Sequence, residues 1–277
     1  MFEPTAEIIA DSVNESGDRL TTFVLTFHRF ILPEFNTHRI FSRNASSSRA
    51  IPVEKMIKLV ESSQVEPIHW GANCKGMSAK EELGSGALLA AQQIWGIARE
   101  SAIASAKAMV KVGTHKQIVN RLLEPFAPIT VICTGTEYQN FFDQRCHPDA
   151  QPEIQALAIA MRGAYDMSEP VEMKVGEWHM PFLDELERSD WGYTLIGRQN
   201  SIKVAVGRCA RVSFLNHDGK RDIQADITLH DRLLSSEPAH LSPFEHCAIA
   251  LSNSEIKANL TGWQSYRKSL EQNNDDS

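Results

Sequence analysis

The sequence predicts an α/β (α+β) chain, because segments with the composition of strands alternate along it with segments that have the periodicity of helices. Residues 20–30 and 129–133 are rich in β-branched and other apolar residues, and both predict strands. Residues 86–112 form a long alanine-rich run closed by Gly113, which predicts a helix. A helix that is apolar over much of its surface normally lies at the centre of a domain or at a subunit interface.

Two further elements are predicted on either side of residues 34–51. Pro33 can open a helical turn over residues 34–39. Residues 52–63 repeat apolar side chains at the spacing of one helix face and predict an amphipathic helix. We therefore expect residues 34–51 to be a loop clamped between two elements.

The later elements are predicted from capping and from periodicity. Ser78 with Glu81 three residues on has the spacing of a capping box and predicts a helix start. Residues 167–191 are predicted to be a loop or strand insertion over the core. Residues 201–214 alternate enough for a helix or a strand, and residues 226–234 predict a helix.

Composition limits the class of protein. The 277 residues carry a formal net charge of -7, which argues against a general nucleic-acid binder, since such domains are usually basic. The five cysteines are scattered and never form a CxxC pair, a pattern that fits reduced thiols rather than a zinc site or disulfides. There is no signal-peptide pattern and no apolar run of about 18 residues. We expect a cytoplasmic protein with no metal and no membrane or nucleic-acid partner.

Residues 34–51 concentrate groups that bind anions. The stretch contains His38, Arg39, Arg43 and Arg49, interleaved with Ser42, Ser46, Ser47 and Ser48. Guanidinium forks match phosphate oxygens bidentately, and hydroxyls add further donors. Apolar residues threaded between the charges suit a segment packed against a core. The stretch predicts a site for a multiply anionic ligand, and the alternative is a solvated basic loop.

The spacing within this stretch resembles the flavin-dependent thymidylate synthases. The family signature is Arg-His-Arg, seven residues, Ser, and Arg two residues later. Here Thr37-His38-Arg39 is followed by seven residues, by Ser47 and then by Arg49. Thr37 replaces an arginine that helps the family hold flavin and nucleotide. The resemblance implies the fold of that family, a central mixed or antiparallel sheet flanked by long helices.

Two later stretches are similar to the same family. Arg121 lies in NRLLEP, which is similar to a family stretch whose arginine reaches the nucleotide phosphate. Asn140 precedes Arg145 by the family's five residues, and the run AQPEI then opens another helix. Thr134 and Thr136 stand where the family usually has Asn and Arg, which removes a flavin-phosphate contact.

A third block resembles the family but comes in a different order. Residues 240–246 (HLSPFEH) resemble the family's His-x-Ser/Thr-Pro-Phe-Glu-His, and residues 210–214 (ARVSF) resemble a stretch near the start of family chains. In the family the heptad precedes the Arg-His-Arg block. We therefore expect a circular permutation, in which residues 201–250 are the displaced N-terminal segment and the strand 247–251 lies in the same sheet as residues 22–30.

The resemblance implies the reductive methylation of dUMP to dTMP, with methylenetetrahydrofolate as the carbon donor and FAD and NADPH as the reductants. It implies that Ser47, Ser48, Arg49, Arg121 and Arg145 bind the substrate, with Ser47 and Arg145 in catalytic roles, and that Thr37, His38, Arg39, Ile40, Asn140, His240, Ser242 and Glu245 bind FAD. Arg145 would polarise the pyrimidine carbonyl. Family enzymes are homotetramers with shared active sites, which the long apolar helix suits.

We expect one catalytic domain over residues 1–277. Its parts are a nucleotide and flavin core at 20–165, an insertion or lid at 166–200, the displaced segment at 201–250 and a C-terminal tail at 251–277, frayed from residue 273.

Alternatives stay open at this level. Cys146 beside His147 is a candidate nucleophile of the kind used by the folate-dependent, cysteine-using thymidylate synthases. Arg121 can instead be a basic helix end that faces a helix dipole. The chain can be a related enzyme that alkylates another pyrimidine nucleotide such as dCMP, or a nucleotide-binding relative that has lost flavin.

Overall fold

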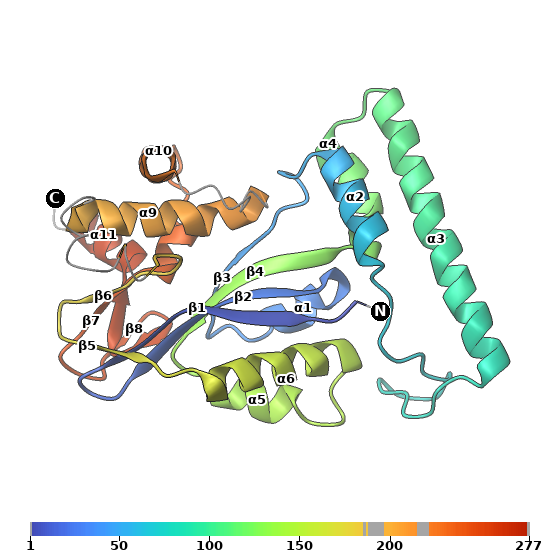
Figure 1. Cartoon of the computed structure of the whole chain (residues 1–277), viewed down its shortest axis with the longest axis horizontal. Helices are drawn as coiled ribbons and strands as arrows, with labels where there is room; N and C mark the ends of the chain where they lie inside the picture. The colour runs from blue at the N-terminus through green and yellow to red at the C-terminus, as the bar shows by residue number, and fades with distance from the viewer. Residues whose placement is uncertain (1, 185–186, 188–196, 215–221, 276–277) are drawn as a thin grey trace.

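A mixed five-stranded sheet lies in the middle of the molecule (Figure 1). The computed structural model describes residues 2–184, 187, 197–214 and 222–275. The strands are β1 (Thr5–Asn14), β2 (Arg19–His28), β3 (Ser42–Ala45), β4 (Pro128–Gly135) and β5 (Val171–Met173), in the order β3-β4-β2-β1-β5. Neighbouring strands are antiparallel except β1 and β5, which are parallel. The predicted strands at 20–30 and 129–133 are confirmed as β2 and β4.

One face of this sheet carries the largest apolar core. Phe23 and Leu25 of β2 point to the same face as Val131 and Cys133 of β4, because side chains alternate along a strand. Helices α5 (Gln139–Arg145) and α6 (Pro152–Met167) cover this face (Figure 1).

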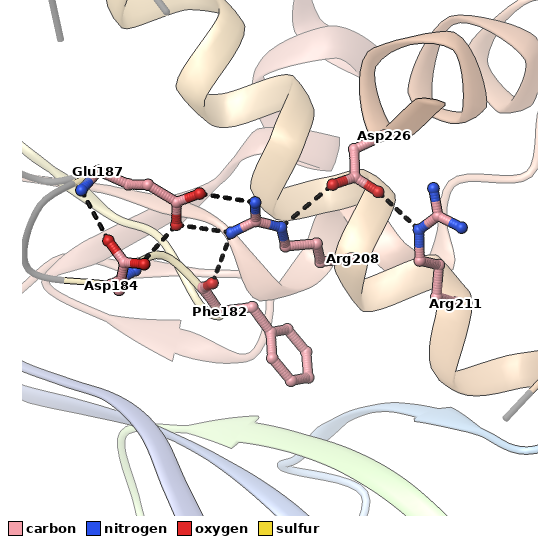
Figure 2. A network of polar contacts seen from close by, with 6 residues as sticks. All are labelled: Phe182, Asp184, Glu187, Arg208, Arg211 and Asp226. Atoms are coloured by element: carbon pink, nitrogen blue, oxygen red, sulfur yellow. Dashed lines mark hydrogen bonds and ion pairs between the residues drawn. The ribbon is translucent and has the colours of Figure 1, made fainter. Parts of the chain in front are cut away.

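The opposite face packs against α9 (Arg198–Arg211), which α10 (Ile223–Leu234) accompanies. Ile132 of β4 contacts Cys209 of α9 in a small apolar cluster. The two helices approach so closely that a Cβ on Gly207 would meet the backbone of Asp226. Glycine therefore allows Arg208 to reach the buried Asp226 (Figure 2).

The C-terminal region forms its own small sheets. A three-stranded sheet has the order β10-β7-β6, and a hairpin joins β8 to β9. Their bounds are β6 Trp178–His179, β7 Ala248–Ala250, β8 Ile256–Lys257, β9 Leu260–Thr261 and β10 Trp263–Ser265, and α11 Tyr266–Asp275 follows. Because β7 pairs only with β6 and β10 among the described strands, the expectation that residues 247–251 lie in the sheet of residues 22–30 is wrong. Leu260 and Trp263 are fully buried, so this tail is part of the core, and α11 extends beyond the predicted fraying point at 273.

A run of buried polar contacts joins the two sheets. Ser12 Oγ lies 2.9 Å from His179 Nδ1, and His179 Nε2 lies 2.8 Å from Thr22 Oγ1. Thr22 Oγ1 is 2.8 Å from Thr134 Oγ1, which is 2.8 Å from His246 Nδ1. Since buried polar groups are costly without partners, these bonds fix how the C-terminal region docks on the sheet.

Helices α2 (Val53–Ser63), α3 (Ser85–Lys111) and α4 (Lys116–Val119) lie together on one side of the main sheet, with α3 outermost (Figure 1). The short helix α1 (Leu32–Asn36) packs into the main core through Phe35. Short 3₁₀ turns lie at Arg29–Ile31, Asn120–Leu122, Glu124–Phe126, Val212–Phe214 and Ser242–His246. The predicted helices at 52–63 and 86–112 are confirmed as α2 and α3. Only Ile103 and Ala106 of α3 are buried, so the long helix is not at the centre of this chain, and a subunit interface remains a prediction.

The predicted helix start at Ser78 is wrong. Residues 81–83 instead pair with residues 70–72 through backbone bonds, from Ala72 N–H to the Glu81 carbonyl and from Leu83 N–H to the Trp70 carbonyl. These bonds compete with the capping pattern, and α3 begins only after Gly84. Parts of the predicted insertion at 167–191 lie outside the described residues. In the described part of the chain, no helix has both the length and the apolar character needed to cross a membrane.

Candidate active site

Residues 34–51 are not the simple loop that the sequence predicts. The end of α1 occupies 34–36, a turn follows, and β3 continues as an edge strand of the main sheet. Ser42 pairs with Thr134 and Ala45 pairs with Val131. The sheet therefore holds the middle of the stretch rigidly, with cationic groups before and after it.

Arg145 and His38 meet at the Ser42 end of β3. Arg145 Nε donates to His38 Nε2 at 2.8 Å, and its Nη2 lies 3.4 Å from Thr37 Oγ1. Burial, with the positive charges of Arg145 and Arg43, lowers the pKa of His38 to about 4. The imidazole is therefore neutral near pH 7, and its Nε2 lone pair accepts the bond. This contact joins two of the blocks that carry the family resemblance.

Arg43 has a different role from the one that the sequence suggests. Its Nη1 donates to the backbone carbonyls of His38 at 3.1 Å and Phe35 at 3.4 Å. These bonds close the turn between α1 and β3. One guanidinium of the cationic stretch therefore supports the backbone beside His38.

The serine turn, residues 46–51, lies at the other end of β3 and is tied down from several sides. Ser47 N–H donates to the Ser213 carbonyl at 3.0 Å. The Asn120 side chain donates to the Ser48 carbonyl at 2.7 Å, and Lys116 Nζ donates to the Ala50 carbonyl at 2.8 Å. Ser48 is buried, whereas Arg49 is exposed at the tip of the turn. The turn presents the exposed guanidinium of Arg49, which has no ion-pair partner among the described residues, on a fixed backbone.

Arg121 follows Asn120 directly and so lies beside the serine turn. It is exposed and pairs with Glu124 at 2.9 Å, and Glu124 also pairs with Arg29 at 3.2 Å. Ser47, Ser48, Arg49 and Arg121 thus gather at one end of β3. Arg145 lies at the opposite end, and the five residue-to-residue steps from Ser42 to Ser47 span roughly 16 Å of extended chain.

The third block that resembles the family, residues 240–246, belongs to the C-terminal region of the chain and lies beside β3. The 3₁₀ turn Ser242–His246 packs on β3 and β4, and His246 bonds to Thr134. Glu245 pairs with Arg267 Nη1 at 2.7 Å. Glu245 and Ser42 line one cavity of about 210 Å³. His240 and Ser242 are exposed and are not among the residues that line this cavity.

The residues that the resemblance assigns to FAD are partly available to a ligand. Arg39 and Asn140 are exposed, and Ile40 exposes 43% of its surface. An apolar side chain next to an exposed guanidinium suits a planar ring that carries phosphate. Thr134 and Thr136 already have partners, since Thr136 Oγ1 accepts from the Thr261 N–H at 3.2 Å. These exposed groups are of the types that can hold the ring and the phosphates of a flavin dinucleotide.

Sequence reasoning missed three groups near the site. Asn120 holds the serine turn, and Lys257 and Arg267 line the cavity with Ser42. Asn120 precedes Arg121 and gives no signal of its own. Lys257 and Arg267 lie in the predicted tail, so only the folding of that tail onto β3 reveals them.

The chain shares a family with nucleotide-modifying enzymes. The family described as "Thymidylate synthase complementing protein" matches residues 19–170, more than half of the sequence. The chain belongs to this family, whose members are flavin-dependent thymidylate synthases. The match contains the stretch 34–51, Arg121, Asn140 and Arg145, and it ends before the block at 240–246.

Two solved structures are similar to the chain. Both are of the UMP/dUMP methylase PolB from Streptomyces cacaoi, one bound with 5-Br UMP and one with 5-Br dUMP. The first has 14% identity and a TM-score of 0.49, and covers 60% of this chain and 89% of that chain. The second has 13% identity and a TM-score of 0.47, and covers 60% and 90%. No match is found among curated proteins.

Proposed function

We propose that the protein is a flavin-dependent thymidylate synthase that methylates C5 of dUMP. The observation that carries this proposal is the bond between Arg145 and neutral His38, inside the residues that match the family. A neutral acceptor orients the guanidinium without cancelling its charge. Arg145 therefore keeps a full positive charge and free donors for a ligand carbonyl or phosphate.

In this proposal Arg145 and the serine turn act on the nucleotide. Arg145 donates to a pyrimidine carbonyl and stabilises negative charge that develops there, which makes C5 a better nucleophile. Ser47, Ser48, Arg49 and Arg121 hold the phosphate. Because the two groups lie at opposite ends of β3, we propose that a site is completed by two chains of a homotetramer, with the exposed apolar side chains of α3 at a subunit contact. Leu89, Ile94 and Ile97 of α3 are each more than half exposed.

FAD, when bound, would supply hydride received from NADPH, and methylenetetrahydrofolate would supply the carbon. Thr37, His38, Arg39, Ile40, Asn140, His240, Ser242 and Glu245 would hold the flavin. The protein's own part is to orient the ring and exclude water. Support comes from the exposed Ile40 next to Arg39 and from the packing of the Ser242–His246 turn against β3.

We also propose that residues 201–250 are the displaced N-terminal segment of the family, within one catalytic domain. Two contacts support a circular permutation despite the separate sheet. The Asn44 side chain donates to the Cys209 carbonyl at 3.0 Å, and Ser47 N–H donates to the Ser213 carbonyl at 3.0 Å. The segment 209–213 therefore lies directly on the stretch that carries the family signature.

Two measurements test the proposed function. An absorbance spectrum of the purified protein, with and without added FAD, should show bound flavin. Product analysis with dUMP, UMP and dCMP, each with methylenetetrahydrofolate and NADPH, should show methylation of dUMP. Bound flavin with another methylated product would favour the second candidate, a pyrimidine-nucleotide methylase of different specificity. A protein that binds nucleotide but never flavin would contradict both.

A further inference from the structure

Asn120 is a fully buried polar residue beneath the serine turn. It begins the 3₁₀ turn Asn120–Leu122, and its neighbours Val119 and Leu123 belong to an apolar cluster that also contains Ile51 and residues of α2. Close packing of this kind holds the side chain in one place. A buried polar residue in such surroundings is explained by the hydrogen bonds that it makes.

The donor end of the Asn120 amide makes two hydrogen bonds. Its Nδ2 donates to the Ser48 carbonyl at 2.7 Å and to the Ile51 carbonyl at 2.9 Å. Its Oδ1 is buried and has no hydrogen-bond partner among the residues that the structure describes. An unsatisfied buried acceptor lowers stability, and an apolar side chain of similar size would avoid that cost. The two donated bonds, rather than packing, therefore account for an amide at this position.

The bond to Ser48 fixes the orientation of the peptide between Ser48 and Arg49. In a trans peptide the carbonyl and the N–H point in opposite directions. Because the Ser48 carbonyl points inward to Asn120, the Arg49 N–H points outward, to the side where Arg49 is exposed. This N–H has no hydrogen-bond partner in the described part of the chain. The turn therefore presents a backbone donor next to the Arg49 guanidinium.

The other bonds of the serine turn support the same arrangement. The N–H groups of Ala50 and Ile51 both donate to the Ser47 carbonyl, at 2.9 and 3.2 Å. The Ser48 N–H belongs to the same peptide as that carbonyl, so it points away from residues 50 and 51. It also has no partner within the described ranges. Two adjacent backbone N–H groups of this kind favour an anion.

We infer that Asn120 is a positioning residue for the nucleotide phosphate, because its bond to the Ser48 carbonyl keeps the backbone N–H groups of the serine turn directed at the ligand. The inference rests on the proposed function, which places that phosphate at the serine turn. Without this bond the Ser48–Arg49 peptide can turn its carbonyl toward water, which then satisfies it. The carbonyl oxygen would face the phosphate and repel it. Asn120 is buried and acts only through the turn.

The test compares Asn120→Leu with Asn14→Leu in the full chain. Leucine has nearly the size of asparagine and donates no hydrogen bond, so Asn120→Leu leaves two carbonyls without their donor. Asn14 is a matched control, because it is only 5% exposed and its Nδ2 donates to the Gly262 carbonyl at 2.9 Å, at the opposite end of the main sheet. Asn120→Asp, which has at most one donor, is a second variant in case leucine prevents folding.

Thermal melting checks that each variant is folded. Calorimetry with FAD present then measures the affinity for dUMP and for deoxyuridine, which lacks the phosphate. We expect Asn120→Leu to bind dUMP at least about tenfold more weakly than the native protein does, with the affinity for deoxyuridine unchanged. Asn14→Leu should bind both as the native protein does. A purely structural role of Asn120 would lower the melting temperature and leave the ratio of the two affinities unchanged.

An unchanged ratio in Asn120→Leu, or in Asn120→Asp if only that variant folds, overturns the inference. A native protein that binds dUMP no better than deoxyuridine also overturns it. Methylation is assayed separately on the native protein. A native protein that prefers dUMP to deoxyuridine but methylates no nucleotide would contradict the proposed function alone. A native protein that methylates dUMP, with an Asn120→Leu variant that keeps the native preference for dUMP, would contradict this inference alone.

Discussion

Two arginines of this molecule are held in opposite ways. Arg208 is 5% exposed and surrounded by carboxylates: its two terminal nitrogens each lie 2.7 Å from Glu187, and its Nε lies 3.1 Å from Asp226 (Figure 2). Arg145, by contrast, is held by the neutral ring of His38 at 2.8 Å. The charge of the hydrogen-bond partner therefore decides whether each guanidinium keeps positive charge for a ligand.

The difference separates a structural cation from one that can serve a ligand. The charge of Arg208 is cancelled inside the protein, and Arg211 shares Asp226 with it at 2.6 Å. Such a buried network fixes α9 against α10 and has little charge left to offer. Arg145 keeps its charge, because imidazole accepts a hydrogen bond without adding a negative charge.

The largest expected effect is the loss of stability when Arg208, the structural arginine, is replaced. Arg208→Met leaves Glu187 and Asp226 buried with one cation fewer, so we expect a loss of about 3–5 kcal/mol of unfolding free energy. Urea denaturation measures it. Arg162→Met, which removes an exposed ion pair with Asp166, should cost less than about 1 kcal/mol. Equal losses of unfolding free energy in the two variants would show that the buried Arg208 network stabilises the fold no more than an exposed ion pair does.

The second effect is on turnover and comes from changing His38, the hydrogen-bond partner of Arg145. His38→Gln keeps a neutral acceptor for Arg145, whereas His38→Glu replaces it with a carboxylate that cancels the charge. We expect His38→Glu to lower turnover by about 10² or more, the scale of losing one transition-state donor, and His38→Gln to retain most of it. Steady-state kinetics of nucleotide methylation measure the turnover of both variants. Similar turnover in the two variants would contradict the role of a neutral partner.

The third effect uses pH. Burial lowers the pKa of His38 to about 4 and that of His246 to about 3, below the ordinary value of 6.5. Below pH 6.5 the unfolded chain takes up protons that the folded chain refuses, so stability falls as the pH drops from about 6.5 towards 4. Each histidine contributes up to about 1.4 kcal/mol per pH unit. Urea denaturation at pH 7, 6 and 5 should show this slope, and His38→Gln should make it shallower.

A smaller effect is expected at the serine turn. Arg49 is exposed on a fixed backbone, so Arg49→Ala should leave the fold unchanged. We expect dUMP to bind at least about tenfold more weakly, about 1.4 kcal/mol, with the flavin content unchanged. Calorimetry measures the affinity, with the exposed Arg232 of α10 changed to Ala as a control. Unchanged dUMP affinity would remove Arg49 from the phosphate site.

The smallest effect is expected at Cys146. Burial raises the pKa of this thiol, which opposes the thiolate that a nucleophile requires. Cys146→Ala should therefore keep full turnover in the methylation assay. Loss of turnover in a folded variant would restore the cysteine mechanism that the sequence leaves open.

The sequence predicts the long periodic elements well and the short or polar ones poorly. The helices α2 and α3 and the strands β2 and β4 have strong patterns, whereas β1 begins with Thr5 and Glu7 and lacks a clear apolar alternation. Strands of two or three residues, such as β6 and β8, are too short to show any period. The capping pattern at Ser78 fails because backbone pairing with residues 70–72 competes with it.

The same limit applies to the candidate site. Local spacing points to His38, Arg49 and Arg145, since each lies in a block with recognisable neighbours. The contact between His38 and Arg145 spans 107 residues, and no local pattern contains it. The role of Arg43 as a backbone brace and the approach of Arg267 to β3 depend on tertiary packing in the same way.

The order of strands in the main sheet also bears on how the protein resists aggregation. Its inner strands β1 and β2 have ten residues each, but its edges are β3 with four residues and β5 with three. The β3 edge therefore offers few unpaired backbone groups to a neighbouring chain. On the other side β5 covers only Ser12–Asn14 of β1, so residues 5–11 of β1 have no strand on their outer side among the described residues. Growth of the sheet by strand addition is therefore restricted at β3, and the outer side of β1 is where another strand has room to pair.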